Sequence, residues 1–311
     1  MYYYKIHGLF VMSDYQFAEL MEIESQDTID ITIRKTRLKQ EYVDETAFEL
    51  ERGFGCMYHY DNKLSVVRFV NQGAFVITFG NTIEYQLKPN FDPVYVNQIF
   101  LTSCIYFLFL QRGYIELHGS GMVRNGKAIA ICGASGAGKS TLTSELLLYD
   151  NIYFCADDTV VISNDELGSI VHAAYPQRKL CKDVALDYQY DINKLVRIEE
   201  VREKYAIPER KKFYCESAPL QAIFVIKVVT CEQVHIKEVV GGDKLKLLMS
   251  ILYKVECFQN FGCNEYELKS WLKIARDIPM YIIERPEKHK TSTKQAELVI
   301  STLDKLEKAY K

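Results

Sequence analysis

A glycine-rich stretch in the middle of the chain constrains the fold more than any other feature of the sequence. Residues 131–141 read ICGASGAGKST and contain the pattern G-x-x-x-x-G-K-S, from Gly133 to Ser140. The apolar run AIAIC precedes this pattern, and TLTSELLL follows it. A buried strand, a glycine turn and a helix in this order form a P-loop, in which backbone N–H groups surround phosphate oxygens. The stretch therefore predicts an α/β domain that binds a nucleoside triphosphate.

The residue types of the loop suit this chemistry. Glycine lets the backbone curl so that successive N–H groups point at phosphate oxygens, and the N-terminus of the following helix adds partial positive charge. Lys139 is expected to reach the β- and γ-phosphates, and the Ser140 hydroxyl is expected to bind Mg²⁺. The predicted nucleotide-binding residues are Gly133, Ala134, Ser135, Gly136, Ala137, Gly138, Lys139, Ser140 and Thr141.

Two neighbouring acids follow the next predicted strand. The segment NIYFCADD places Asp157 18 residues after Lys139, with Asp158 beside it. Neighbouring side chains of an extended strand point to opposite faces, so the two carboxylates are expected to have different roles. One would hold or orient the metal, and the other would take a proton from an acceptor hydroxyl. A cap of a helix or turn beside the real site is the alternative interpretation.

A histidine and two cations are further candidates for the same site. If YIEL and KAIAIC are adjacent strands joined by a hairpin at RNGK, His118 lies at the sheet edge that carries the P-loop. Its imidazole would then bind an aspartate or a phosphate oxygen, with a structural role equally open. In YPQRKL, Arg178 and Lys179 are candidates to neutralise charge on a transferred phosphoryl group, against the alternative of a solvated face. The cluster in PERKKF, residues 210–212, is the weaker candidate.

The N-terminal part of the chain has a different pattern of residue types. Short segments rich in aromatic and β-branched residues are broken by Gly, Asn or Asp and predict strands within residues 2–13, 28–36, 55–61, 64–70, 73–80 and 82–88. A helix is predicted next, with Pro93 at its start and Gly113 past its end. These patterns predict a β-rich N-terminal domain over residues 1–91, a linking helix over 92–113 and a P-loop catalytic domain over 114–311.

The C-terminal part is expected to complete the α/β domain. Strands are predicted at residues 159–163, 169–175, 220–229, 233–239 and 280–285, and helices at residues 243–256, 264–275 and 292–310. Residues 188–217 are charged, contain Pro208 and show no clean period. They are interpreted as an ordinary surface excursion, with a mobile lid as the alternative.

Composition excludes some classes of protein. A net charge of −3 argues against a broad grip on nucleic acid, which needs a basic face. The nine cysteines form no C-x-x-C pair, so reduced thiols in a cytoplasmic protein are predicted rather than a disulfide framework or a zinc site. The run IFLTSCIYFLFL, residues 99–110, is shorter than the ~20 residues of a spanning helix, so a buried helix and no membrane partner are predicted.

The segments LHGSG, GASGAGKST and CADDTVVI together resemble the HPr kinase family, P-loop serine kinases that are unrelated to ordinary protein kinases. The resemblance covers residues 114 to about 180 well. It implies an ATP- and Mg²⁺-dependent kinase whose active site contains His118, Lys139, Ser140, Asp157 and Asp158. By the same resemblance, the first aspartate would be the base and the second the metal-side carboxylate.

Two departures from the HPr enzymes redirect this expectation. The glutamate that usually follows G-K-S is Thr141 here, and the glycine- and arginine-rich C-terminal signature tied to phosphorylase activity is missing. The opening YYYKIHGLFVMSD…FAEL and the stretch AYPQRKLCKD are closer to the HPr kinase-like proteins of lasso-peptide and other ribosomal-peptide gene clusters. Those enzymes phosphorylate a serine of a small precursor peptide. The resemblance thus implies a serine kinase of a precursor peptide or small protein, and it is compatible with a homo-oligomer.

Two alternatives remain open at the level of sequence. The acceptor would be HPr itself or a small metabolite if the peptide resemblance is misleading. A nucleotide-gated binding protein, which uses ATP as a switch without transferring a phosphoryl group, is the alternative from another class. The paired aspartates argue against a switch, because a switch needs only one carboxylate for the metal.

Overall fold

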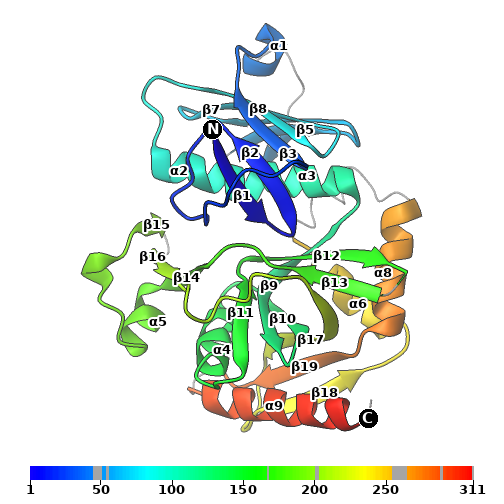
Figure 1. Cartoon of the computed structure of the whole chain (residues 1–311). Helices are drawn as coiled ribbons and strands as arrows, with labels where there is room; N and C mark the ends of the chain where they lie inside the picture. Colours follow the sequence, from blue (N-terminus) through cyan, green and yellow to red (C-terminus); the bar gives the residue numbers. More distant parts are fainter. Residues whose placement is uncertain are drawn as a thin grey trace. The chain divides into compact units, whose positions relative to one another are not determined.

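The chain forms a mixed α/β structure with several sheets, divided into two compact units. The computed structural model describes residues 1–44, 51–53, 56–166, 168–199, 203–253, 265–287 and 290–309. The first unit lies within residues 1–115 and the second within residues 116–309. Figure 1 shows the helices and strands of both units, coloured along the sequence.

The first unit is built on an eight-stranded sheet of order β1-β2-β3-β8-β7-β6-β5-β4. β3 runs parallel to β2 and β8, and the other pairs are antiparallel. The predicted segment 2–13 holds two strands, because His7 and Gly8 both adopt positive φ and turn the chain. The strands are β1 (Tyr2–Ile6), β2 (Leu9–Ser13), β3 (Ile31–Lys35), β4 (Glu51–Gly53), β5 (Cys56–Tyr60), β6 (Leu64–Phe69), β7 (Gly73–Thr78) and β8 (Thr82–Leu87), and a short helix α1 (Gln40–Val43) follows β3.

One long helix completes this unit. It runs through α2 (Pro93–Gln98), a π-helical turn η1 (Ile99–Cys104) and α3 (Ile105–Arg112). Asp92 caps its start, since its Oδ1 accepts from the backbone N–H of Val94 at 2.9 Å, and Gly113 ends it with a φ of 69°. Phe100 meets the rings of Phe75 and Tyr85 edge-on, at centroid distances of 5.0 and 5.2 Å. The helix predicted as a linker over residues 92–113 therefore belongs to the N-terminal unit.

This helix begins and ends where the sequence predicts, at Pro93 and just before Gly113. Among the described helices, Pro93–Arg112 is the one whose length and hydropathy would suit a membrane span. The twelve-residue apolar run, residues 99–110, lies inside this helix, and the polar residues Asn97, Gln98, Gln111 and Arg112 flank it. Two thirds of the apolar window, 67%, is buried. Such burial is the packing of a core helix.

The second unit begins with a hairpin. β9 (Ile115–Arg124) and β10 (Lys127–Gly133) pair antiparallel, and the turn residues Asn125 and Gly126 both have positive φ. This confirms the hairpin predicted at RNGK. β10 also pairs in parallel with β17 (Ala218–Val228), which pairs in parallel with β19 (Met280–Arg285). The carboxyl ends of these three strands therefore meet at one edge, where α/β proteins bind ligands.

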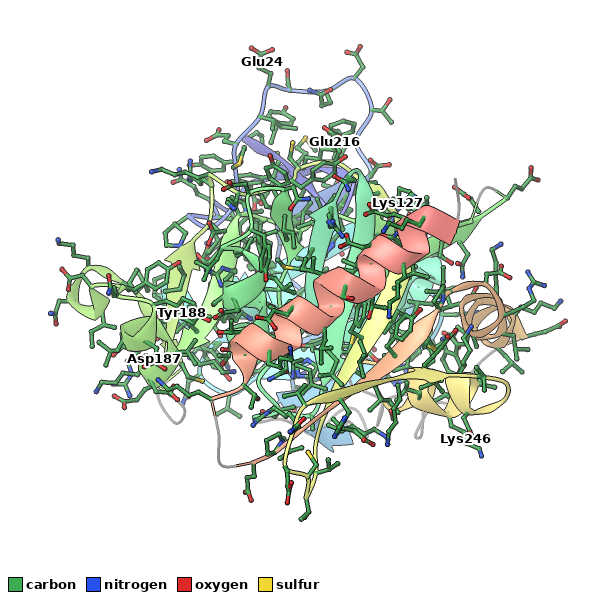
Figure 2. All side chains as sticks on the ribbon, turned by 90° about the horizontal axis from the view of Figure 1, so that it is seen from below. Glu24, Lys127, Asp187, Tyr188, Glu216 and Lys246 are labelled. Carbon is green, nitrogen blue, oxygen red and sulfur yellow. The ribbon has the colours of Figure 1, made fainter. Side chains whose placement is uncertain are left out.

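The remaining strands close a circuit of pairings. β9 also pairs with β11 (Ile152–Ala156) and β12 (Thr159–Asp165), and β13 (Gly168–His172) joins β12 to β17, while β18 (His235–Val239) lies at the other edge of β19. The helices α4 (Lys139–Leu146) and α9 (Ser292–Ala309) pack on this sheet through buried residues of both, including Leu142, Leu146, Val299 and Leu303. Figure 2 shows α9 crossing over the strands.

Two further helices lie in the second unit. α6 (Asp243–Met249) is shorter than the helix predicted over residues 243–256, and residues 254–256 lie outside the described residues. The chain leaves the helix at this point because its backbone pairs with β9, where the N–H of His118 donates to the carbonyl of Ile251 at 2.8 Å. α8 (Glu265–Asp277) coincides with the helix predicted over residues 264–275.

A separate three-stranded sheet corrects the interpretation of residues 188–217. β14 (Gln177–Cys181), β16 (Lys204–Pro208) and β15 (Arg197–Glu199) pair in the order β14-β16-β15. Leu180 and Ile207 form a buried cluster with Ala185 of α5 (Lys182–Asp187), and a short 3-10 turn η2 (Ile192–Lys194) precedes β15. The sequence shows no clear period over this segment because its strands are too short to produce one.

Candidate active site

The glycine loop joins the carboxyl end of β10 to the start of α4. Gly133 has a φ of 146°, and a Cβ there would lie 2.7 Å from the carbonyl oxygen of Ile226, so glycine allows β10 to lie against β17. Gly138, at the N-cap of α4, has a φ of 103° and no side chain to accept from the first turn. The first N–H groups of α4 are therefore left for another acceptor, as in an anion-binding helix start.

Lys139 is held inside the loop by three acceptors. Its Nζ donates to the carbonyl oxygens of Gly133 at 2.8 Å and Ala134 at 3.1 Å, and lies 3.1 Å from Nε2 of His118. An ammonium group has three protons, so each has an acceptor. Burial lowers the pKa of Lys139.

His118 links this lysine to the acid pair. Its Nδ1 lies 3.1 Å from the backbone carbonyl oxygen of Asp158. Because Nε2 accepts from Lys139, Nδ1 carries the proton and donates to that carbonyl. Burial and the charge of Lys139 lower the pKa of His118, so the imidazole is neutral at neutral pH.

Asp157 is held by two donors. The hydroxyl of Ser120 donates to Oδ1 at 2.8 Å, and the backbone N–H of Lys179 donates to Oδ2 at 2.7 Å. Burial raises the pKa of Asp157, the charge of Asp158 raises it further, and the two hydrogen bonds offset only part of the increase. A fixed carboxylate with raised proton affinity has the properties of a general base.

Asp158 has a different environment. Its Oδ2 accepts from Nζ of Lys179 at 2.9 Å, and its φ of 66° lies in the left-handed region. Burial raises the pKa of Asp158, but the charge and the hydrogen bond of Lys179, together with the charge of Lys204, outweigh burial and hold that pKa below its usual value. The two carboxylates thus point in different directions because Asp158 lies in a left-handed turn after β11. The predicted cause, alternation along an extended strand, is not the one observed. Environments that drive two pKa values apart are typical of an acid-base site.

The two candidate cations of β14, Arg178 and Lys179, point in opposite directions. Lys179 pairs with Asp158, whereas Arg178 is buried and donates to Glu209 at 2.9 Å, Ser144 at 2.8 Å and Tyr190 at 3.0 Å. The structure therefore does not bring Arg178 to the acid pair. Arg178 instead joins β14 to the P-loop helix α4 through Ser144. The two cations diverge because neighbouring side chains of a strand point to opposite faces.

In the basic cluster of residues 210–212, Lys212 has a structural role. Lys212 donates from Nζ to the carbonyl oxygens of Leu147 and Tyr149, at 2.8 and 2.7 Å, just past the end of α4. A cation at this end of a helix is favoured by the helix dipole.

Three residues near the site were not predicted from the sequence. Ser120 follows His118 by two positions on β9, so strand alternation places both on one face. Arg285, at the carboxyl end of β19, donates from Nε to the carbonyl oxygen of Ala137 at 2.9 Å. Its position at the end of a predicted strand was the available signal. Lys204 is the third, and nothing in its sequence context pointed to the site.

The donor set suits an ion that arrives with a nucleotide. Within the described residues, no group of three or more His, Cys, Asp or Glu side chains is placed to hold a metal ion. The Ser140 hydroxyl makes no hydrogen bond to any described residue, and Asp158 supplies a carboxylate held ionised by cations. Mg²⁺ keeps several waters and binds through one or two protein ligands plus phosphates. Ser140 and Asp158 fit that pattern.

Comparisons with known proteins give likenesses to solved structures. No family model matches the chain, and no curated protein matches it. The HPr(Ser) kinase/phosphatase from Coxiella burnetii aligns over 62% of this chain and 98% of its own, at 11% identity and a TM-score of 0.33. That score is too low to carry an argument about activity. The functional assignment therefore rests on the geometry of the site.

Proposed function

We propose that this protein is an ATP- and Mg²⁺-dependent kinase that transfers the γ-phosphoryl group to a serine hydroxyl of a precursor peptide or small protein. One observation carries the proposal. Two adjacent carboxylates, Asp157 and Asp158, have opposite electrostatic environments, and His118 links them to the P-loop lysine. A nucleotide switch needs a carboxylate for its metal but has no use for a second one with raised proton affinity.

The proposed step balances as a single in-line transfer. The acceptor oxygen attacks the γ-phosphorus, a new O–P bond forms, and the bond from that phosphorus to the β,γ-bridging oxygen breaks. The bond's electron pair leaves on ADP, and the acceptor's proton passes to the carboxylate of Asp157. Ser120 and the N–H of Lys179 hold this carboxylate in place through the step.

The P-loop residues bind and neutralise charge. Lys139 would exchange its loop carbonyls for phosphate oxygens, with neutral His118 keeping its ammonium beside the acid pair. Ser140 and Asp158 would hold Mg²⁺, which neutralises charge on the phosphates. Lys179 keeps Asp158 ionised and so available to the ion.

The acceptor class comes from the sequence resemblance. The N-terminal opening and the stretch AYPQRKLCKD resemble kinases of ribosomal-peptide gene clusters. A peptide or small protein with an accessible serine is therefore the proposed partner, and an assembly into homo-oligomers is compatible with it.

Intact mass spectrometry of acceptors tests the proposal. The protein, ATP and Mg²⁺ are incubated with a precursor peptide encoded beside the gene, its serine-to-alanine version, and HPr. We expect one phosphoryl addition to the peptide and none to the alanine version. Modification of HPr alone would move the acceptor to HPr, and tight ATP binding with no modified acceptor would favour the switch.

A matched pair of variants tests the role of Asp157. Asp157→Asn should lower transfer by about 100-fold or more while nucleotide affinity changes little. Asp150→Asn removes an exposed carboxylate just after α4 and should leave both quantities unchanged. Equal transfer by the two variants would rule out Asp157 as the base.

A further inference from the structure

Arg285 approaches the P-loop from the side of the sheet that lies away from the acid pair. It is the last residue of β19, and its Nε donates to the carbonyl oxygen of Ala137 at 2.9 Å. Its Nη1 donates to the carbonyl oxygen of Pro286, also at 2.9 Å. Hydrogen bonds from two different nitrogens fix the plane of a guanidinium group. The side chain is therefore held in one orientation beside the loop.

The fixed guanidinium still has unused donors. A guanidinium group carries five N–H donors, and the two hydrogen bonds of Arg285 use two of them. Within the described part of the chain, Nη2 donates to no acceptor. Nη2 lies next to the phosphate-binding turn, because a Cβ at Gly138 would be 3.7 Å from it. Arg285 therefore presents N–H donors at the rim of the P-loop.

The order of the strands sets the direction of a bound triphosphate. Across the sheet the strands follow one another as β11, β9, β10, β17 and β19, so the P-loop after β10 lies in the middle (Figure 1). Lys139 points towards β9, where its Nζ lies 3.1 Å from Nε2 of His118, and the acid pair follows β11. The γ-phosphate, which the P-loop lysine and the acid pair act on, therefore lies on the β9 side.

The nucleoside is at the other end of the phosphate chain, so it extends over the carboxyl ends of β17 and β19. Ligands of open α/β sheets bind beyond the carboxyl ends of strands. Val228 of β17 is directly opposite Arg285 of β19, so the two side chains lie on one face of the sheet. Val228 is 41% exposed. An apolar side chain next to a fixed guanidinium suits a planar base, because a guanidinium donates in its plane and stacks through its faces.

We propose that Arg285 and Val228 form the subsite for the nucleoside of the bound nucleotide. The unused N–H groups of Arg285 donate to acceptor atoms of the nucleoside, and Val228 contacts the base. The subsite distinguishes a nucleotide from a free polyphosphate. This inference rests on the proposed kinase function, which requires a nucleotide in the P-loop and leaves the contacts of its nucleoside open.

Tripolyphosphate separates this role from a purely structural one. It has the three phosphates of ATP without the nucleoside, so it tests the P-loop alone. Calorimetry in the presence of Mg²⁺ measures the affinity of each protein for ATP and for tripolyphosphate. We expect Arg285→Met to lower the affinity for ATP about tenfold and the affinity for tripolyphosphate by no more than about twofold. An arginine that only braces the loop would lower both affinities by the same factor.

Two further variants complete the set. Val228→Ser removes the apolar contact and should lower only the affinity for ATP, by about threefold. Arg276→Met is the matched control, because Arg276 is an exposed arginine of α8, and it should equal the wild type with both ligands. Thermal unfolding shows whether each variant folds. If Arg285→Met does not fold, Val228→Ser decides by the same comparison.

The outcomes separate the two proposals. Equal losses for ATP and tripolyphosphate, or no loss for either, would overturn the nucleoside subsite and leave the kinase function standing. A loss confined to ATP supports the subsite, even if the wild type modifies no acceptor, a result that would count against the kinase function alone. A wild type that binds neither ligand would overturn both proposals.

Discussion

At the residue scale, Asp157 and Asp158 change the stability of the fold in opposite directions. The pKa of Asp157 is raised, so its folded environment disfavours the charge and costs stability above the unfolded pKa. The pKa of Asp158 is lowered, so its charge contributes stability that is lost only as the pH falls through that lowered pKa.

Neutral amides at these two positions should therefore move stability in opposite directions. At pH 7.5 and without ligands, Asp157→Asn should raise the midpoint of thermal unfolding by about 2–4 °C, since strained active-site groups trade stability for activity. Asp158→Asn should lower it, because Lys179 is left buried without its partner. Scanning calorimetry measures both. Two shifts of the same sign would contradict this account of the pair.

His118 should give a pH dependence of its own. Its pKa is lowered on folding, so between that pKa and about 6.5 the unfolded chain binds more protons and stability falls as the pH falls. Denaturant unfolding of the wild type should therefore show a steeper loss of stability from pH 7.5 to 5.5 than His118→Gln. Parallel curves would show that the imidazole titrates as in water.

Arg285 positions the P-loop from β19. Its Nε donates to the carbonyl oxygen of Ala137, next to the helix cap at Gly138. Arg285→Ala should weaken ATP affinity by about tenfold, since a hydrogen bond to a charged group contributes ~1.5–3 kcal/mol. Arg276→Ala, at an exposed arginine of α8, is the control. Unchanged ATP binding by Arg285→Ala would remove Arg285 from the nucleotide site.

At the element scale, β14 connects the P-loop helix to the acid pair. Arg178 ties it to α4 through Ser144, and the next residue donates its backbone N–H to Asp157. Figure 2 labels Tyr188, just after α5, whose hydroxyl donates to Glu145 of α4 at 2.8 Å. One contact from β14 and one from the end of α5 thus join this part of the chain to α4.

Removing the contact between Arg178 and Ser144 should displace the proposed base, Asp157, without changing Asp157 itself. Arg178→Met should destabilise the protein by about 3 kcal/mol, because the partly buried Glu209 loses the cation that neutralises it. Adding Glu209→Gln should recover part of that loss. Both variants should bind ATP normally and transfer slowly, as measured by calorimetry and acceptor mass. Full transfer in the single variant would show that β14 holds its place without Arg178.

At the scale of the whole molecule, the nucleotide should stabilise one unit. The P-loop, His118, the acid pair and β14 all lie in the second unit. A ligand protects the parts that bind it from local opening. Hydrogen exchange with Mg²⁺ and a non-hydrolysable ATP analogue should slow within residues 116–199 and leave residues 1–44 and 56–115 unchanged. Slower exchange in the first unit would place part of the binding site there.

The sequence by itself determined the local parts of this protein. The strand, glycine loop and helix at residues 127–146, the hairpin before them and the helix that begins at Pro93 were all predicted, because each depends on backbone preferences within a few residues. His118, Lys139, Asp157, Asp158 and Lys179 were predicted from motifs, their spacing and the family resemblance, and the structure brings these side chains together.

Only the tertiary structure decided which way the remaining side chains point. Arg178 and Lys179 are neighbours in sequence, yet the pairing of β14 with β16 buries one against α4 and turns the other to Asp158. Arg285 reaches the P-loop from β19, a strand far along the chain, through a register that depends on long-range pairing. Such contacts are set by how elements pack, and no local pattern encodes that.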